Sequence, residues 1–63
     1  MISDEIREKW DMQIEVLLTE YGSRLSLWES EFLDSIQMWR SNDRDLTFRQ
    51  SKKLREIFNR LSV

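Results

Sequence analysis

Large apolar residues between residues 26 and 40 recur at the spacing of one helix face. The row consists of Trp28, Phe32, Ile36 and Trp39. At about 100° per residue, spacings of four, four and three residues bring these side chains together. Ser26 and Glu29 form a Ser-x-x-Glu capping box, in which each side chain satisfies a free backbone donor. The pattern predicts a helix over residues 26–40 whose aromatic row is the most buried part of the chain.

An earlier apolar stripe predicts a helix over residues 3–21. The stripe consists of Ile6, Trp10, Ile14, Leu17 and Tyr21. Ser3 is a favourable N-cap residue, and acidic residues follow it where the positive end of the helix dipole favours carboxylates. Gly22 is the single glycine of the chain and follows the stripe directly. We expect Gly22 to end this helix in the left-handed conformation.

The third predicted helix covers residues 47–61. Thr47 and Gln50 form a second capping box at its start. Its apolar stripe consists of Leu54, Ile57, Phe58 and Leu61. Connections of about four to six residues favour antiparallel neighbours. We therefore expect an all-α fold, a small three-helix antiparallel bundle forming one domain over residues 1–63, with the aromatic row packed between the other two stripes.

The composition agrees with a small helical protein. Hydrophobic residues make up 40% of the 63 residues and charged residues 35%, with one glycine and no proline. This balance is typical of folded helical domains rather than of disordered or turn-rich chains. No apolar run approaches the ~20 residues that a membrane span requires. The first five residues are acidic and lack the apolar segment of a secretory signal, so we expect a cytoplasmic protein that does not enter membranes.

The residue types that most catalytic and metal sites require are missing. The chain has no cysteine and no histidine, which removes thiolate nucleophiles, imidazole bases and the usual zinc ligands. The hydroxyl groups lack a histidine to activate them, and no glycine-rich loop is present to bind phosphates. We expect no enzymatic activity, no cofactor, no metal ion and no small-molecule substrate.

Charge is divided along the chain. Residues 1–39 carry a balance of −6 and residues 40–63 a balance of +4, which together give the net charge of −2. The acidic side of the first predicted helix consists of Asp4, Glu8, Asp11 and Glu15. Carboxylates along one exposed face diverge, whereas a hard cation needs several oxygens that converge. The alternatives are therefore a solvated face and a surface that contacts a partner.

Four apolar residues lie away from the predicted stripes. They are Met12, Val16, Leu27 and Met38. Scattered exposed apolar residues are ordinary, but methionines adapt well to binding surfaces. Together with the acidic side of the first helix, these residues are the predicted contact surface for another protein or for a second copy in a homodimer. Such a protein acts as an inhibitor when its carboxylates occupy sites meant for the phosphates of nucleic acid.

The third predicted helix has a basic side, which supports an alternative function. Its residues are Arg49, Lys53 and Arg60, with Lys52 and Arg44 nearby. Lysine and arginine spaced along a helix neutralise phosphates and release counterions. Glu56 interrupts this side, and no aromatic residue is interleaved for base stacking. The alternatives are an accessory protein that binds nucleic acid and a solvated face that complements the acidic first helix.

The segment from Trp28 to Leu61 resembles a short helical segment of phage and prophage proteins linked to DNA metabolism. The matching residues are Trp28, Glu29, Phe32, Ile36, Leu46, Thr47, Gln50, Leu54 and Ile57. The likeness covers about half of the chain, leaves out the first predicted helix and brings no catalytic residues. It implies a phage-type accessory protein, and it favours the inhibitor and the nucleic-acid readings over an unrelated role.

Overall fold

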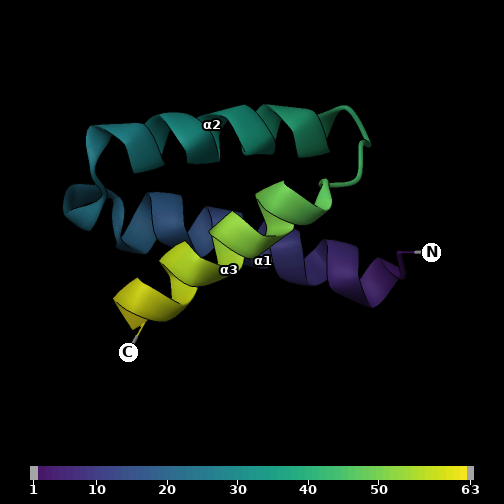
Figure 1. Ribbon diagram of the computed structural model, residues 1–63, viewed down its shortest axis with the longest axis horizontal. Coiled ribbons are helices and arrows are strands. Elements are labelled where there is room, and N and C mark those ends of the chain that lie inside the picture. The colour runs from purple at the N-terminus through teal and green to yellow at the C-terminus, as the bar shows by residue number, and fades with distance from the viewer. Residues whose placement is uncertain (1, 63) are drawn as a thin grey trace.

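The computed structural model describes residues 2–62 and shows an all-α fold of three helices (Figure 1). The helices are α1 (Asp4–Glu20), α2 (Leu27–Ser41) and α3 (Phe48–Ser62), with a short 3-10 helix, Gly22–Arg24, between α1 and α2. Each α-helix contacts the other two, and residues 2–62 contain no strand. The three predicted helices are confirmed, with ends that differ by one residue.

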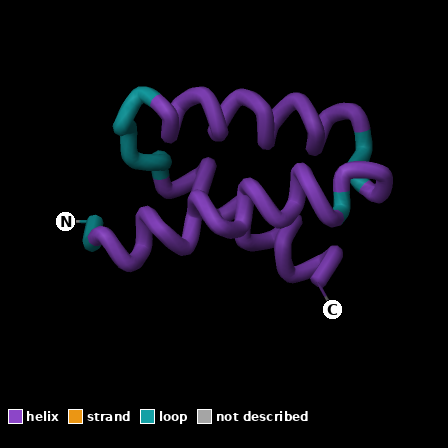
Figure 2. Tube along the Cα trace, turned by 180° about the vertical axis from the view of Figure 1, so that it is seen from behind, coloured by secondary structure: helices purple, strands orange, loops and turns teal. Residues whose placement is uncertain are grey.

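Two of the helices are antiparallel and the third crosses them at an angle. Figure 1 shows α1 and α2 side by side, running in opposite directions, with α3 crossing α1 obliquely. Figure 2 shows from behind that helices make up nearly all of the described chain and that two short connections join them. The α2–α3 connection brings the start of α3 back to the first half of α1, where Phe48 lines one groove with Ile6. The apolar sides of all three helices contribute to one core.

Side-chain caps fix the starts of the helices, as predicted. The Ser3 hydroxyl accepts a hydrogen bond from the Ile6 N–H. Ser26 and Glu29 exchange hydrogen bonds of 2.9 and 3.2 Å in a complete capping box. Thr47 and Gln50 form the same reciprocal pair at the start of α3. Each cap satisfies backbone N–H groups that have no partner within the helix.

The core lies at the centre of the three helices. Its buried apolar residues are Trp10, Ile14, Leu17, Leu33, Ile36, Leu46, Leu54, Ile57 and Leu61. The predicted stripes of the first and third helices contribute most of this core. At the margin, Phe32, Trp39 and Phe58 are partly buried, and Ile6 is exposed.

The prediction that the aromatic row of α2 is the most buried part of the protein is wrong. Trp28 is 55% exposed, and Phe32 and Trp39 are only partly buried. The helix is rotated so that Leu33, which is fully buried, enters the core beside Ile36. Trp28 still has an aromatic contact at the surface, because its indole stacks on the Phe32 ring with ring centroids 5.4 Å apart. This stacking offsets part of the burial that Trp28 lacks.

The role predicted for Gly22 is also wrong. No glycine among residues 2–62 has a positive φ angle, and Gly22 begins the 3-10 helix instead of ending α1 in the left-handed conformation. The left-handed residue is Asp43, with φ 58°, after the end of α2. The Asp43 N–H binds the Arg40 carbonyl and the Arg44 N–H binds the Trp39 carbonyl. These two hydrogen bonds form a Schellman motif, the usual place of a C-terminal glycine.

Candidate functional site

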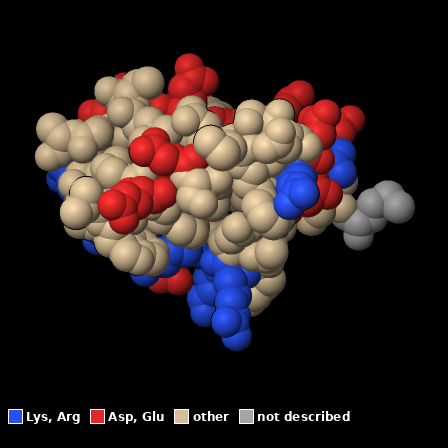
Figure 3. Space-filling view, turned by 90° about the horizontal axis from the view of Figure 1, so that it is seen from above, with Lys and Arg blue, Asp and Glu red and all other residues tan. Residues whose placement is uncertain are grey.

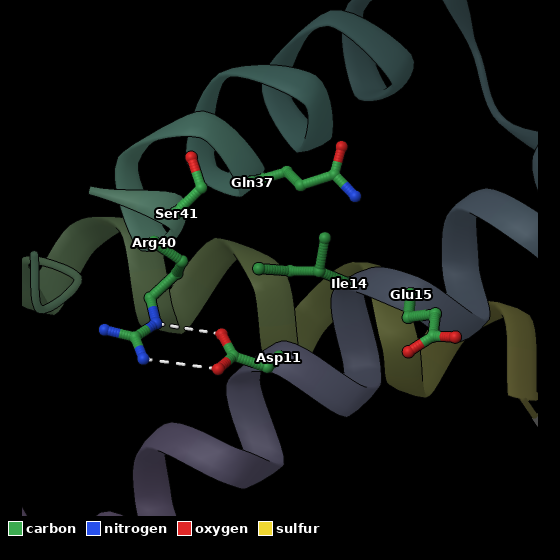
Figure 4. Close-up of a pocket in the computed structure, with 6 residues that line it drawn as sticks. All are labelled: Asp11, Ile14, Glu15, Gln37, Arg40 and Ser41. Carbon is green, nitrogen blue, oxygen red and sulfur yellow. Dashed lines mark hydrogen bonds and ion pairs between the residues drawn. The ribbon is translucent and has the colours of Figure 1, made fainter. Parts of the chain in front are cut away.

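A groove between α1 and α2 is lined by two of the four acidic residues predicted for partner binding, Asp11 and Glu15 (Figure 4). Its volume is about 410 Å³, and its lining residues are Asp11, Ile14, Glu15, Gln37, Arg40 and Ser41. The Arg40 guanidinium donates hydrogen bonds of 2.8 and 3.2 Å to the two Asp11 carboxylate oxygens. The hydrogen bond to Asp11 is the main cause that raises the pKa of Arg40 above its ordinary value, so the guanidinium stays charged at the wall of the groove.

The acidic residues of α1 divide into paired and unpaired groups. Asp4 is paired with Arg7 at 3.0 Å and Asp11 with Arg40. Glu8 and Glu15 are exposed, and no ion pair within residues 2–62 includes them. The sequence suggested four equivalent carboxylates, but two of them already neutralise arginines of the same chain. Within the described chain, no three carboxylates gather closely enough to hold a metal ion.

The four apolar residues predicted for partner binding lie on two helices. Leu27 and Met38 are 77% and 69% exposed on α2, whereas Met12 and Val16 belong to α1, where Val16 is half-buried. Met38 lines a second groove with Asp34, Gln37 and Ser41, and the last two residues also line the groove of Figure 4. Through these shared residues the two grooves connect Met38 to Asp11 and Glu15, whereas Met12 and Val16 line neither groove.

Leu27 and Met38 share the outer face of α2 with two carboxylates. Positions 27, 31, 34 and 38 fall within about 60° of one another on a helix, on the side away from Leu33 and Ile36. Glu31 and Asp34 are exposed, and no ion pair of residues 2–62 includes them. Figure 3 looks down on α2 and shows acidic side chains across this surface. We call Leu27, Glu31, Asp34 and Met38 the α2 outer face.

Most basic residues predicted for nucleic acid have partners within the protein. The Lys53 ammonium lies 5.2 Å from the centre of the Trp28 ring, and the Arg44 guanidinium lies 4.9 Å from that of Trp39. Arg60 donates a hydrogen bond to Glu29. The remaining two, Arg49 and Lys52, are exposed, and no ion pair of the described residues includes them. The basic side of α3 contains no interleaved aromatic residue, but α2 supplies one, because Trp28 lies next to Lys53.

A third groove, which the sequence pattern did not predict, lies between α1 and α3. Its volume is about 310 Å³, and its lining residues are Ile2, Ile6, Lys9, Trp10, Gln13, Phe48, Ser51, Lys52 and Arg55. Phe48 is 78% exposed and Ile6 is 42% exposed. Phe48 lies six residues before Leu54, far from the stripe of α3, and this offset is the signal that predicts its exposure. We call these residues the α1–α3 groove.

Two carboxyl groups have lowered pKa values. The Ser26 backbone N–H, followed by the Arg60 guanidinium, holds the pKa of Glu29 below its ordinary value. Hydrogen bonds of 2.7 and 3.1 Å from Arg7 lower the pKa of Asp45 in the same way. Both carboxylates are stabilised in the charged form: Glu29 first by the N-cap of its own helix and then by Arg60 of α3, and Asp45 by Arg7 of α1. Their positions at a helix start and in a connection indicate a structural role.

Within residues 2–62, every helix is too short or too polar to span a lipid bilayer. Comparison with models of protein families, with curated proteins and with solved structures gives no match.

Proposed function

We propose that this protein is a non-enzymatic interaction module that binds another protein through the α2 outer face. The observation that supports this proposal most is the exposure of Leu27 and Met38, which lie three helical turns apart on one side of α2. Apolar side chains at this spacing are the anchors by which one helix packs on another. Leu27 and Met38 take no part in the core, so both are available for such a contact.

The charge of the α2 outer face favours a basic partner. Glu31 and Asp34 lie between the two apolar anchors and are free of ion pairs with residues 2–62. Complementary charges steer association and select against partners of like charge. A basic protein surface that normally binds the phosphates of nucleic acid fits these carboxylates. The resemblance of the α2–α3 segment to phage proteins of DNA metabolism supports an inhibitor of that kind.

An affinity capture with matched variants tests this proposal. The bait is the tagged full chain in extract of the native host, compared with a Leu27→Ser/Met38→Ser variant and with Met12→Ser as the control. Met12 is 46% exposed on another helix, so the control loses an exposed apolar side chain away from α2. We expect a protein retained by the wild type and the control and lost by the double variant. Equal retention by all three baits contradicts the proposal.

A second candidate function, binding of nucleic acid, is supported by the contact between Lys53 and Trp28. An exposed aromatic ring beside a cation is the combination that single-stranded nucleic acid uses for stacking and phosphate contact. If this function is correct, single-stranded DNA quenches tryptophan fluorescence at low salt, and the binding weakens steeply as salt increases. Arg49→Ala/Lys53→Ala removes the binding. Absence of quenching at low salt contradicts this candidate.

A further inference from the structure

We infer that the α1–α3 groove binds the α2 outer face of a second copy of this chain, in a head-to-tail arrangement. The groove and the face belong to different sides of the molecule, because α2 contributes no residue to the lining of the groove. The inference rests on the proposed function, because it uses the same α2 surface. It adds a second copy of this chain to the partners of that surface.

The groove has the apolar walls of a docking site. Phe48 is the most exposed large hydrophobic residue among residues 2–62, and Ile6 faces it from α1. Trp10, which is buried in the core, also lines the groove. A phenyl ring this exposed contributes nothing to the core and gains from any contact that removes it from water. The groove therefore presents apolar surface that folding of one chain leaves uncovered.

The charge of the groove is entirely positive. Lys9, Lys52 and Arg55 line it, and its lining residues include no carboxylate. No ion pair within residues 2–62 includes any of these three cations. This concentration of positive charge lies on a protein whose net charge is −2. A partner that fits must therefore bring apolar side chains together with carboxylates.

The α2 outer face has the pattern that the groove requires. It combines two exposed apolar side chains, Leu27 and Met38, with the carboxylates of Glu31 and Asp34. The helix rises about 10 Å from Glu31 to Met38. Each wall of the groove spans the same number of residues of its own helix, from Ile6 to Gln13 on α1 and from Phe48 to Arg55 on α3. One apolar anchor and two carboxylates of α2 thus match the length of the groove.

Like-charge repulsion disfavours the symmetric arrangements. Two α2 outer faces in contact bring Glu31 and Asp34 against the same carboxylates of the other copy. Two α1–α3 grooves in contact bring together the cations of Lys9, Lys52 and Arg55. Only the contact of one groove with one α2 face pairs opposite charges. Such a heterologous contact leaves a free groove on one copy and a free face on the other, so it continues into a chain or closes into a ring.

Sedimentation of matched variants tests the inference. The face variant is Leu27→Ser/Met38→Ser, the groove variant is Phe48→Ser, and Met12→Ser is the control. For the wild type and the control, we expect an average mass that rises with concentration and falls when salt is raised from about 0.05 to 0.5 M. Each of the other two variants alone stays monomeric. We expect circular dichroism to show all variants folded, because none of these residues is buried in the core.

Mixing the two variants gives the decisive result. The groove variant retains an intact α2 outer face and the face variant retains an intact groove, so the mixture forms 1:1 pairs and nothing larger. A wild type that stays monomeric at millimolar concentration overturns the inference, and so does self-association that survives either variant. A mixture that stays monomeric also overturns it. The proposed function is judged separately, because capture of a different protein depends on Leu27 and Met38 and is unaffected by Phe48→Ser.

Discussion

The Arg40 guanidinium binds both carboxylate oxygens of Asp11 and thereby joins α2 to α1 across 29 residues of sequence. Its side chain is only 10% exposed, and its third nitrogen donates a 2.8 Å hydrogen bond to the Arg44 carbonyl. Asp45, in the same connection, binds Arg7 of α1, and its carbonyl accepts a hydrogen bond from the Trp39 indole. Arg40 therefore holds two helices and the α2–α3 connection in one network.

Replacement of Arg40 should destabilise the protein more than replacement of its exposed partner. Arg40→Ala leaves the Arg44 carbonyl and the Asp11 carboxylate without their donor, and we expect it to lower the free energy of unfolding by about 1–3 kcal/mol. Asp11 is half exposed, so Asp11→Ala should cost about 1 kcal/mol or less. Urea titration measures both, with Arg49→Ala as a neutral exposed control. Equal values for Arg40→Ala and Arg49→Ala would show that the network contributes nothing.

The rotation of α2 predicts opposite effects for neighbouring large residues. Leu33 is fully buried, so Leu33→Ala should cost about 2–5 kcal/mol, most of the ~5 kcal/mol expected for a domain of this size. Trp28→Ala removes a larger but half-exposed side chain and should cost about 1 kcal/mol, largely its stacking on Phe32. Circular dichroism melting curves distinguish the two variants. A lower melting temperature for Trp28→Ala than for Leu33→Ala would place the indole in the core instead.

The starts of the helices could be predicted because their causes are local. Ser26 with Glu29 and Thr47 with Gln50 are each three residues apart, so the sequence alone contains both partners of each cap. The side of α2 that faces the core could not be predicted in the same way. Trp28 and Leu33 belong to two overlapping rows that share Ile36, and only contacts with α1 and α3 decide which row is buried.

The candidate surfaces were predictable only in part, for a similar reason. The exposure of Leu27 and Met38 follows from their offset within α2. The pairing of Asp11 with Arg40, by contrast, depends on how α1 and α2 pack, and it removes one carboxylate from the predicted acidic surface. The α1–α3 groove depends on the crossing of two helices that are distant in sequence, so Ile6 and Phe48 carry no common signal before folding.

The backbone at Gly22 and Asp43 predicts two stabilising substitutions. Gly22 has no positive φ, and a Cβ atom there would meet nothing within 4 Å, so Gly22→Ala should stabilise the protein by about 0.4–1 kcal/mol by restricting the unfolded chain. Asp43 has φ 58°, so Asp43→Gly should stabilise it by about 0.5–1 kcal/mol by relieving the left-handed strain. Urea midpoints measure both changes. Asp43→Ala is the control and should destabilise the protein, because alanine tolerates a positive φ angle less well than aspartate does. A destabilising effect of Gly22→Ala would contradict the observed backbone.

Stability should decrease as the pH falls below the ordinary carboxyl range. The pKa values of Glu29 and Asp45 are lowered from ordinary values of 4.5 and 3.8, so between its unfolded and folded pKa each group binds more protons in the unfolded chain. Their stabilising contribution is fully present above those ordinary values and is lost as the pH falls through the folded pKa. Urea midpoints from neutral to acidic pH measure this loss.

Glu29→Gln keeps the shape of the cap but removes the charge that attracts Arg60. This variant should start with lower stability at neutral pH and lose less of it on acidification. An identical pH profile for the variant and the wild type would show that Glu29 is not responsible.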